Sequence, residues 1–322
     1  MRAAYASALN PESPLDGLVL GERPEPEERQ GWTTVRVKAA SLNHHDLWTL
    51  RGVGISGDRL PMILGCDAAG VDTATGDEVV VHSVISADGW SGDETLDPGR
   101  SLLSEKHQGT LAELVTVPSR NVIRKPTELS FAEAACLPTA WLTAYRMLFV
   151  NSHLRPGNTV LVQGASGGVA SACIGLARAA GLRVWATART EAKQAAALEL
   201  GAHESFASGA RLPERVDAVM ETVGATTWSH SLKSLRPGGQ VVISGATSGA
   251  VPPAELNRIF FLQLQVIGST MGTKAELADL MSFLRATGLR PRIDRTLPLD
   301  RIAEGLTAME SGSLIGKIVI EP

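Results

Sequence analysis

The sequence is poor in cysteine and in aromatic residues, has no excess of positive charge and contains no long apolar run. Three cysteines, Cys66, Cys136 and Cys173, occur without a CxxC pair, which predicts a reduced, cytoplasmic protein without a disulfide framework. The formal net charge of -4 and the aromatic content of 4% argue against a nucleic-acid partner, which would need a basic stripe or a stacking platform. A transmembrane helix needs about 18 apolar residues in a row, and a signal peptide needs an apolar core. Neither is found, so no membrane association is expected.

What is present divides into two patterns. The 322 residues exceed one ordinary core, so two domains are expected. From Arg2 to about Pro118, short alternating segments such as TTVRVKAASL and DEVVVHSVI predict a β-rich domain. After Pro126, SFAEAACLPTAWLTAYRMLFV predicts two helices broken at Pro138, and six strand candidates then alternate with helices or crossovers from TVLVQG to LQVIGS. That alternation predicts an α/β fold with a doubly wound, parallel, six-stranded sheet.

The closing strand, GKIVIEP, has no slot in the parallel sheet and is expected to return to the N-terminal domain. We therefore assign residues 1–125 and 270–322 to the β-rich domain. Residues 126–269 form the predicted parallel-sheet domain.

The strongest local signal is TVLVQGASGGVASACIGLARAAG. An apolar strand runs into Gly164, Gly167 and Gly168 and then directly into a helix with one apolar stripe. Glycines let the backbone approach a pyrophosphate closely, and the free N–H groups at a helix start favour its negative charge. An ordinary strand-to-helix turn would also use glycine, but strand, loop and helix in this order favour a dinucleotide site.

The end of the next strand, RVWATART, bears on which dinucleotide is bound. Proteins that bind NAD place Asp or Glu there, where it accepts a hydrogen bond from the ribose 2′-hydroxyl. Here the strand ends in Ala188, Arg189 and Thr190, and the first acid is Glu191. Arg189 would bind a 2′-phosphate through a charge-assisted bond, and Lys193, one helical turn on, would add to it. Arg189 as a solvated surface charge is the alternative; we favour NADPH.

The segment SLNHHDLW places His44, His45 and Asp46 next to one another. Imidazole and carboxylate are common zinc ligands. Adjacent residues, however, point about 100° apart on a helix and to opposite faces of a strand, so they are poorly placed to share one ion.

Together these motifs resemble the medium-chain dehydrogenase/reductase family, specifically its zinc-free, quinone-oxidoreductase-like branch. The resemblance covers almost the whole chain. It depends on LNHHDLW, LGCDAAG, GDEVVV, GTLAELVTVP, LTAY, VLVQGASGGVAS, LRPGGQVVISGAT and GKIVI. It implies a GroES-like β-rich domain with the substrate site, a Rossmann domain that binds NAD(P)H, and a homodimer joined through the last Rossmann strand, near Gln265 to Ser269.

The resemblance also bears on the metal. In zinc-dependent members the position of Asn43 is a cysteine ligand, and the ligand motif Gly-His-Glu corresponds here to Gly65-Cys66-Asp67. The third ligand, a cysteine, corresponds to Thr139 or a residue beside it. Because amide and hydroxyl groups are weak zinc donors, no metal site is expected.

Two further observations concern metals. The lobe that holds a structural zinc in such relatives contains no cysteine between Ser83 and Pro118. A residual site made of Cys66, Asp67 and His45 is the less favoured alternative.

The resemblance implies catalytic roles for Asn43, His45 and Thr139. The Asn43 amide would hydrogen-bond a substrate carbonyl or the nicotinamide ribose; its alternative role is to cap the turn between strand and helix. His44 and His45 occupy positions where zinc-dependent members have a cofactor-phosphate contact and a proton-relay hydroxyl, and either could act as an acid near neutral pH. A packed or solvated histidine is the alternative. The predicted cofactor contacts are His44, Asp46, Thr143, Gly164, Ser166, Gly167, Gly168, Val169, Arg189, Lys193, Val223, Gly245, Ala246 and Lys317.

Two departures from the family pattern qualify this reading. Related NADPH enzymes often have a tyrosine after the third Rossmann strand, where this sequence has Ser208. Enoyl-thioester reductases of the family have a tyrosine about eleven residues after the asparagine, near Gly54 here. No tyrosine lies between Tyr5 and Tyr145, which argues against that activity.

The expected function is therefore a zinc-independent, NADPH-dependent oxidoreductase that transfers hydride to a quinone or an activated C=C or C=O substrate. The cofactor carries the chemistry, while the protein orients the substrate, polarises it and excludes water. The proton would come from solvent or His45. Two alternatives are an alcohol-dehydrogenase-like carbonyl reductase that uses His45 in place of zinc, and a non-catalytic NADPH sensor. The expected partner is a small-molecule substrate.

Overall fold

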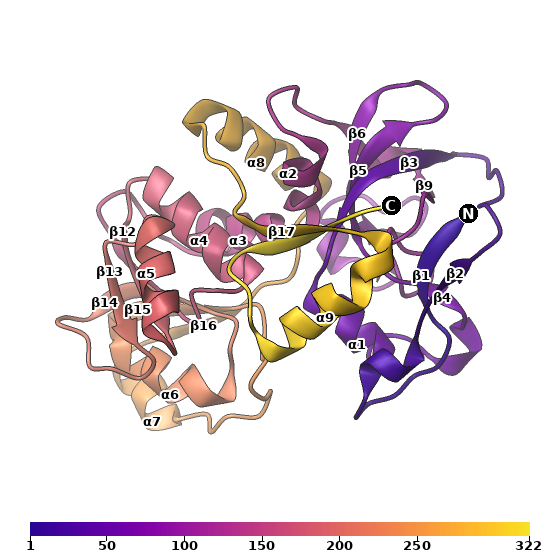
Figure 1. The fold of residues 1–322 in the computed structure, drawn as a ribbon. Helices are drawn as coiled ribbons and strands as arrows, with labels where there is room; N and C mark the ends of the chain where they lie inside the picture. Colours follow the sequence, from indigo (N-terminus) through magenta and orange to yellow (C-terminus); the bar gives the residue numbers. More distant parts are fainter. The chain divides into compact units, whose positions relative to one another are not determined.

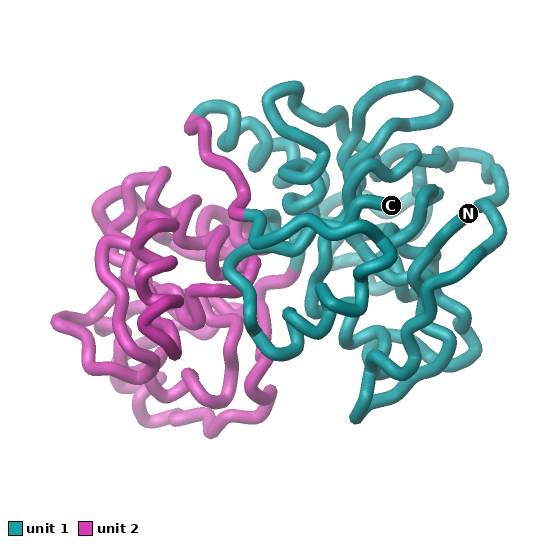
Figure 2. The backbone as a smooth tube through the Cα atoms, viewed as in Figure 1, with its two compact units in different colours: residues 1–142, 271–286, 293–322 teal, residues 143–270, 287–292 magenta.

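Two structural units share the 322 residues, all of which the computed structural model describes (Figures 1 and 2). Unit 1 comprises Met1–Leu142, Met271–Ala286 and Ile293–Pro322, and unit 2 comprises Thr143–Thr270 and Thr287–Arg292. The boundary falls after residue 142 rather than at the predicted residue 125. The reason is that α2 (Phe131–Ala135) packs on β3 (Trp32–Ser41) and β5 (Asp67–Asp72) of unit 1.

Unit 1 is built on a mostly antiparallel sheet of seven strands. Their order is β10-β6-β5-β3-β18-β17, with β9 also paired to β3. The remaining bounds are β6 (Glu78–Val81), β9 (Leu114–Pro118), β10 (Val122–Arg124), β17 (Ile293–Pro298) and β18 (Lys317–Glu321). Alternate residues of these strands, among them Val35, Val37, Val79 and Val81, are buried in one hydrophobic core.

Smaller elements complete unit 1. A three-stranded sheet has the order β2-β1-β4, and β7 pairs with β8. The bounds are β1 (Arg2–Ala6), β2 (Leu18–Glu22), β4 (Met62–Ile63), β7 (Val84–Ile85) and β8 (Ser101–Leu102). The helices are α1 (His44–Leu50), α2, α8 (Lys274–Thr287) and α9 (Ile302–Ser311). None of the helices of the chain combines the length and the apolar character needed to cross a bilayer.

The closing strand returns to unit 1, as predicted. β18 pairs antiparallel with β3 through Val319 opposite Ser41 and Ile320 opposite Ala40, and it pairs in parallel with β17. This register places the first residue of β18, Lys317, beside the chain that leaves β3 at Leu42 and Asn43. Residues 275 positions apart, Leu42 and Lys317, thus meet at one end of the sheet.

Unit 2 is the predicted parallel sheet. Its six strands have the order β13-β12-β11-β14-β15-β16, and every pair is parallel. The strands are β11 (Thr159–Val162), β12 (Arg183–Ala188), β13 (Glu204–Ala207), β14 (Val216–Glu221), β15 (Leu235–Ile243) and β16 (Gln265–Gly268). The helices are α3 (Leu142–Tyr145), α4 (Gly168–Ala179), α5 (Glu191–Glu199), α6 (Ala225–Ser234) and α7 (Leu256–Phe261). Residues 208–215 join β13 to β14 without a helix.

The predicted helix break at Pro138 is misplaced by two residues. The chain interrupts its helix at Cys136 and then forms a wide π-helical turn over Leu137–Trp141 that contains Pro138. Proline is tolerated in the first turn of a helical segment because its missing N–H would have no partner there. Helical structure therefore continues through α3 and a second π turn, Arg146–Val150.

Candidate active site

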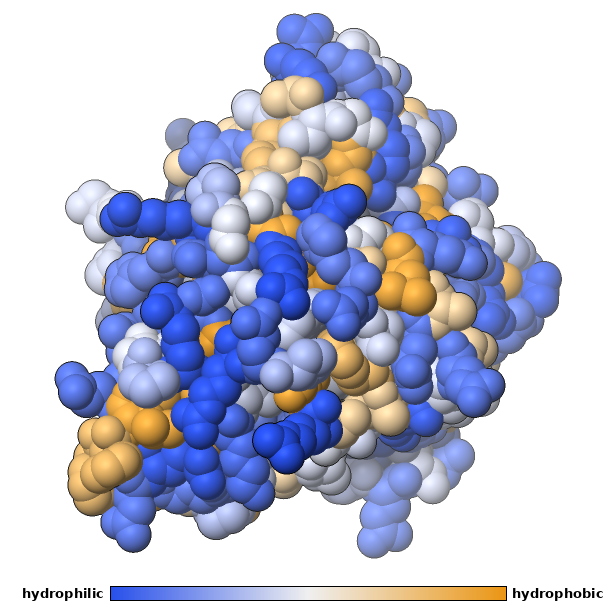
Figure 3. All heavy atoms as spheres, turned by 90° about the vertical axis from the view of Figure 1, so that its left-hand side faces the viewer, coloured by the Kyte–Doolittle hydropathy of each residue, from blue (hydrophilic) through white to orange (hydrophobic).

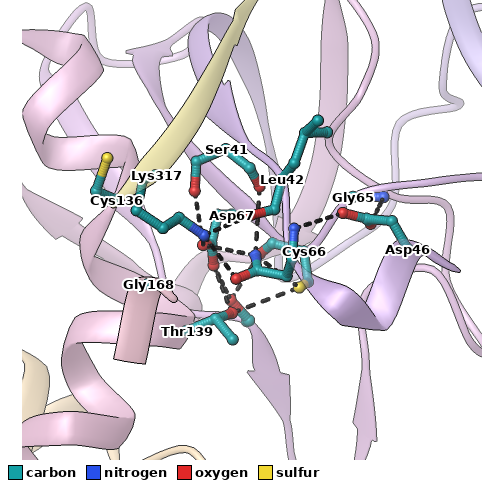
Figure 4. A network of polar contacts seen from close by, with 12 residues as sticks. Ser41, Leu42, Asp46, Gly65, Cys66, Asp67, Cys136, Thr139, Gly168 and Lys317 are labelled. Atoms are coloured by element: carbon teal, nitrogen blue, oxygen red, sulfur yellow. Dashed lines mark hydrogen bonds and ion pairs between the residues drawn. The ribbon is translucent and has the colours of Figure 1, made fainter. Parts of the chain in front are cut away.

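A cluster of polar side chains surrounds the carboxylate of Asp67 at the start of β5 (Figure 4). Asp67 is fully buried. Its Oδ2 accepts hydrogen bonds from Ser41 Oγ at 2.9 Å and Asn43 Nδ2 at 2.8 Å. Its Oδ1 accepts from Thr139 Oγ1 at 2.5 Å. Ser83 Oγ lies 3.4 Å from Oδ1, but its one hydrogen is donated to the backbone oxygen of Cys66 at 2.6 Å. Burying a carboxylate is strongly destabilising unless it is hydrogen-bonded and paired, and the donors Ser41, Asn43 and Thr139 meet the first requirement.

Lys317 supplies the opposite charge that pairs with the buried carboxylate of Asp67. Its side chain is 3% exposed, and its Nζ lies 3.6 Å from Asp67 Oδ2. Nζ also donates to the backbone oxygen of Leu42 and to Asn43 Oδ1, both at 2.6 Å. A buried ammonium group thus contacts both Asn43 and Asp67.

These contacts fix the orientation of the Asn43 amide. Oδ1 faces the ammonium of Lys317, and Nδ2 faces the carboxylate of Asp67; a flipped amide would set donor against donor and acceptor against acceptor. Nδ2 also donates to Ser41 O at 3.3 Å, so both amide hydrogens are occupied. The Asn43 backbone N–H donates to Asp46 Oδ2 at 2.8 Å, where Asn43 caps α1. The predicted contact between the Asn43 amide and a substrate stays a prediction.

Thr139 and Cys66 form the other side of the cluster. Thr139 is partly exposed, whereas Cys66 is fully buried, and their Oγ1 and Sγ atoms are 3.4 Å apart. Burial, followed by the negative charges of Asp67 and Asp46, raises the pKa of the Cys66 thiol well above its ordinary value. In this environment the neutral thiol is favoured over the thiolate. No group of three His, Cys, Asp or Glu side chains lies close enough to hold a metal ion.

Asp46 ties the first turn of α1 to the chain before β5. Its Oδ1 accepts from the backbone N–H of Gly65 at 3.0 Å, and its Oδ2 accepts from that of Asn43. Gly65 has a φ of 94°, and a Cβ there would lie 2.5 Å from Thr110 Oγ1, so only glycine fits. Burial raises the pKa of Asp46 to about 6, outweighing the hydrogen bond from the Asn43 backbone N–H, which lowers it. A cofactor contact for Asp46 stays a prediction.

The two histidines occupy different environments. Burial, followed by the charges of Lys317 and Arg51, lowers the pKa of His44, which favours a neutral imidazole. The side chain of His45 is 10% exposed, and its Nε2 has no hydrogen-bond partner. The carboxylate of Glu105 is close to it, with Oε1 4.0 Å from Nε2. His45 is therefore not part of the cluster around Cys66 and Asp67.

In unit 2, the glycine loop between β11 and α4 has the backbone that a pyrophosphate requires. Gly164 has a φ of 70°, a left-handed conformation that favours glycine. Gly167 precedes the first turn of α4, and a Cβ built there would meet nothing within 4 Å. The loop therefore leaves open space beside the N–H groups of a 12-residue helix, which fits a bound anion. Ser166, Gly168 and Val169 belong to the same loop and first turn.

The neighbouring strand ends converge on this loop. A Cβ built on Gly164 would lie 2.8 Å from Val223 Cγ2, which places the loop after β14 beside the glycine loop. A buried carboxylate, Glu221, holds that second loop: it accepts from the N–H groups of Val223 at 2.7 Å and Gly224 at 3.1 Å. A Cβ on Gly224 would in turn meet Ala246, next to Gly245. The structure thus brings the predicted contacts Gly164, Val223 and Ala246 together.

The end of β12 carries two cations. Arg189 is exposed, and Thr190 caps α5 by accepting the backbone N–H of Lys193 at 3.3 Å. Partial burial, followed by the charge of Arg189, lowers the pKa of Lys193, so the two side chains lie close enough to repel each other. Two cations at this strand end favour an anionic ligand.

The predicted site residues fall into two groups. Asn43, His44, His45, Asp46, Thr139 and Lys317 lie in unit 1, and Thr143, Gly164, Ser166, Gly167, Gly168, Val169, Arg189, Lys193, Val223, Gly245 and Ala246 lie in unit 2. Sequence reasoning missed the central position of Asp67 and the partners Glu105 and Glu221. One signal was available: Lys317 opens the apolar strand KIVI, and a lysine buried in a sheet needs a carboxylate or carbonyl partner.

Both halves of the chain match known family models. Residues 29–127 match the alcohol dehydrogenase GroES-like domain, and residues 168–286 match the zinc-binding dehydrogenase model. Quinone oxidoreductase from Lama guanicoe is 30% identical over 318 residues, covering 92% of this chain and 90% of the relative. Acryloyl-coenzyme A reductase from Sulfurisphaera tokodaii is 27% identical over 327 residues, covering 96% and 98%. A crystal structure of an NAD-dependent alcohol dehydrogenase superimposes with a TM-score of 0.92 at 35% identity and covers all of both chains.

The fold and the glycine loop define an oxidoreductase built from a GroES-like domain and a Rossmann domain, which confirms the predicted fold class. The chain belongs to the medium-chain dehydrogenase/reductase family. A nicotinamide cofactor and a small-molecule substrate are typical of this family.

Proposed function

We propose that the protein is a zinc-independent, NADPH-dependent oxidoreductase that reduces a quinone or another activated C=C or C=O substrate. The observation that carries the proposal is the ammonium group of Lys317 inside the polar cluster, 2.6 Å from Asn43 Oδ1 and 3.6 Å from Asp67 Oδ2. A divalent cation bound by the same groups would be repelled by this ammonium. The side chains that correspond to zinc ligands are satisfied without a metal.

The preference for NADPH is supported by Arg189 and Lys193 at the end of β12. A 2′-phosphate would relieve the repulsion between these two cations. The end of β12 has no carboxylate before Glu191 that could accept a hydrogen bond from a 2′-hydroxyl. The similar alcohol dehydrogenase structure is of an NAD-dependent enzyme, so this preference is inferred from the side chains of this chain alone.

Each unit contributes its own part of the mechanism. A bound nicotinamide would supply the hydride. The glycine loop before α4 would bind the pyrophosphate, and Glu221 would keep the neighbouring Val223 loop in place. In unit 1 the network around Asp67 holds Asn43 and Thr139 rigidly, so little reorganisation is needed when a substrate binds. Reduced quinone could take its proton from water.

An alcohol-dehydrogenase-like carbonyl reductase is the second candidate, and His45 favours it. An alkoxide forming on a carbonyl substrate needs a positioned acid. His45 Nε2 has no hydrogen-bond partner, while Glu105, 4.0 Å away, could stabilise a protonated imidazole.

We also propose a homodimer joined through β16, in a cytoplasmic protein. β16 is an edge strand of the six-stranded sheet, and exposed edges are templates for pairing with another chain. Its Val266 is 44% exposed, and Phe261 at the end of the preceding α7 is 80% exposed. In Figure 3, apolar surface appears at the lower left of the face and in other patches nearer its centre. A second copy would cover these apolar side chains.

The function is tested by NADPH oxidation with a panel of quinones, enones, aldehydes and ketones. We expect turnover with quinones. Gly167→Asp should abolish it, because a negative charge would face the pyrophosphate. Tight NADPH binding without turnover on any class would instead indicate a sensor.

A further inference from the structure

A chain of hydrogen bonds runs through unit 2 from the end of β14 to the loop that follows β13. Its members, in order, are Glu221, Ser231, Gln163, His230 and the backbone of Ala210. The first three are fully buried. Gln163 immediately precedes the glycine loop, and Ser231 and His230 are neighbours on α6. The chain therefore joins loops that follow β11 and β13, two strands that are not neighbours in the sheet.

The carboxylate of Glu221 fixes the direction of the first bonds. A carboxylate can only accept, so Ser231 Oγ donates its one hydrogen to Glu221 Oε2 at 2.6 Å. Ser231 Oγ must then accept from Gln163 Nε2 at 3.0 Å. This orientation of the amide agrees with its other side, where Gln163 Oε1 accepts from Thr187 Oγ1 at 2.5 Å. The second hydrogen of Gln163 Nε2 is left for His230.

His230 carries the chain to the loop of residues 208–215. Its Nδ1 lies 2.9 Å from Gln163 Nε2 and has to accept, because the amide nitrogen only donates. The ring hydrogen is then on Nε2, which donates it to the backbone oxygen of Ala210 at 2.8 Å. Both ring nitrogens are thus used, and the tautomer follows from the position of Glu221 at the other end of the chain.

The loop that His230 holds begins beside the two cations at the end of β12. The backbone N–H of Ser208 donates to the oxygen of Ala188 at 3.1 Å, and Ala188 directly precedes Arg189. Ligands of doubly wound sheets bind outside the carboxyl ends of the strands, which is where this loop lies. The loop has no helix of its own, and the bond from His230 holds its backbone two residues after Ser208.

We propose that His230 is a positioning residue of the cofactor site, which holds the loop of residues 208–215 against the adenosine half of bound NADPH. The inference rests on the proposed function, because it takes NADPH as the cofactor and Arg189 as the partner of its 2′-phosphate. His230 acts through the loop and not by contact with the cofactor. Loss of its bond to Ala210 would therefore weaken binding of the adenosine half and leave binding of the nicotinamide half unchanged.

Two substitutions separate the two sides of the imidazole ring. His230→Asn places an oxygen near the position of Nδ1 and keeps an acceptor for Gln163, but it is too short to reach Ala210. His230→Gln places an amide nitrogen near the position of Nε2 and keeps the donor to Ala210. Calorimetry measures binding of NADPH and of adenosine 2′,5′-bisphosphate, which has no nicotinamide.

We expect His230→Asn to weaken both ligands by the same factor, about three- to tenfold, the range of one net hydrogen bond. His230→Gln should restore both affinities, which a general loss of stability would not do. His153→Asn, the same change at an exposed histidine of unit 2, should leave both affinities unchanged.

Unchanged affinities in His230→Asn, a loss for NADPH that the bisphosphate does not share, or no recovery in His230→Gln would each overturn the inference. Nitrogen NMR of the parent protein decides the matter even if His230→Asn fails to fold, since a ring hydrogen on Nδ1 would contradict the chain of bonds. A parent protein that binds no NADPH would overturn the proposed function and this inference together. A parent that binds NADPH while His230→Asn changes nothing would overturn the inference alone.

Discussion

Polar residues of two kinds occupy the candidate sites. Arg189 and Lys193 lie close together at the end of β12, and His45 has an Nε2 atom without a hydrogen-bond partner. Asn43, Thr139 and Lys317, by contrast, act together through Asp67. We therefore expect a substitution at Arg189, Lys193 or His45 to act locally. A substitution in the network around Asp67 should also disturb the other members of that network.

Arg189→Asp should reverse or erase the preference for NADPH. In the parent protein we expect NADPH to bind at least about tenfold more tightly than NADH, which corresponds to about 1.4 kcal/mol. The new carboxylate would repel a 2′-phosphate and accept from a 2′-hydroxyl. Dissociation constants for both cofactors give the answer. Arg155→Asp, an exposed arginine before β11, should not change the ratio, and equal constants in the parent would refute the preference.

His45→Ala distinguishes quinone reduction from carbonyl reduction. With quinones we expect turnover to fall by much less than a hundredfold, since water can supply the protons. Carbonyl reduction should fall by about 10²- to 10⁴-fold, the usual contribution of a general acid. Steady-state kinetics on both classes measures this, with the exposed His153→Ala as control. A loss beyond a hundredfold on quinones would show that His45 is the required proton donor.

The start of helix α1 is held by the carboxylate of Asp46, which changes its protonation state in the acidic pH range. Asp46 accepts N–H bonds from Asn43 and Gly65 at the start of this helix. Burial raises its pKa from 3.8 to about 6, so the folded protein binds this proton more tightly than the unfolded chain. The associated stability is fully present below about pH 4 and is lost as the pH rises through about 6.

Asp46→Asn should therefore flatten the pH dependence of the free energy of unfolding between about pH 4 and 6. The asparagine cannot ionise, although it accepts fewer N–H bonds and should lower stability at every pH. Denaturant titrations at several pH values measure the slope. The exposed Asp88→Asn should keep the parent slope. A slope in Asp46→Asn equal to that of the parent would contradict the assignment.

Some helices and strands of the fold could be predicted from the sequence, and some contacts could not. The six parallel strands were predictable because apolar strand runs alternate with helical periods, and the glycine loop identifies the first strand. The helix break at Pro138 was wrongly placed, because proline in the first turn of a wide helical segment costs little. The partnership of Asp67, Thr139 and Lys317 joins segments some 70 and 250 residues apart, and no local pattern encodes such a contact.

At the scale of the whole molecule, the edge strand β16 bears on assembly. We expect the parent protein to sediment as a dimer. Val266→Asp or Phe261→Asp should shift it toward the monomer, because the charge would be buried without a partner at the interface. Leu96→Asp, on an exposed residue of unit 1, should leave the dimer intact. A parent protein that is monomeric at micromolar concentrations would refute the proposed interface.

The whole account depends on catalysis without a metal at the cluster of Asn43, Asp67 and Lys317. The most direct measurement is NADPH oxidation with a quinone by protein that has been dialysed against a strong chelator and shown by elemental analysis to contain well under one zinc per chain. We expect the same turnover and the same melting temperature before and after dialysis, because the ammonium of Lys317 already satisfies Asn43 and Asp67. Loss of turnover that returns when one equivalent of zinc is added would contradict it.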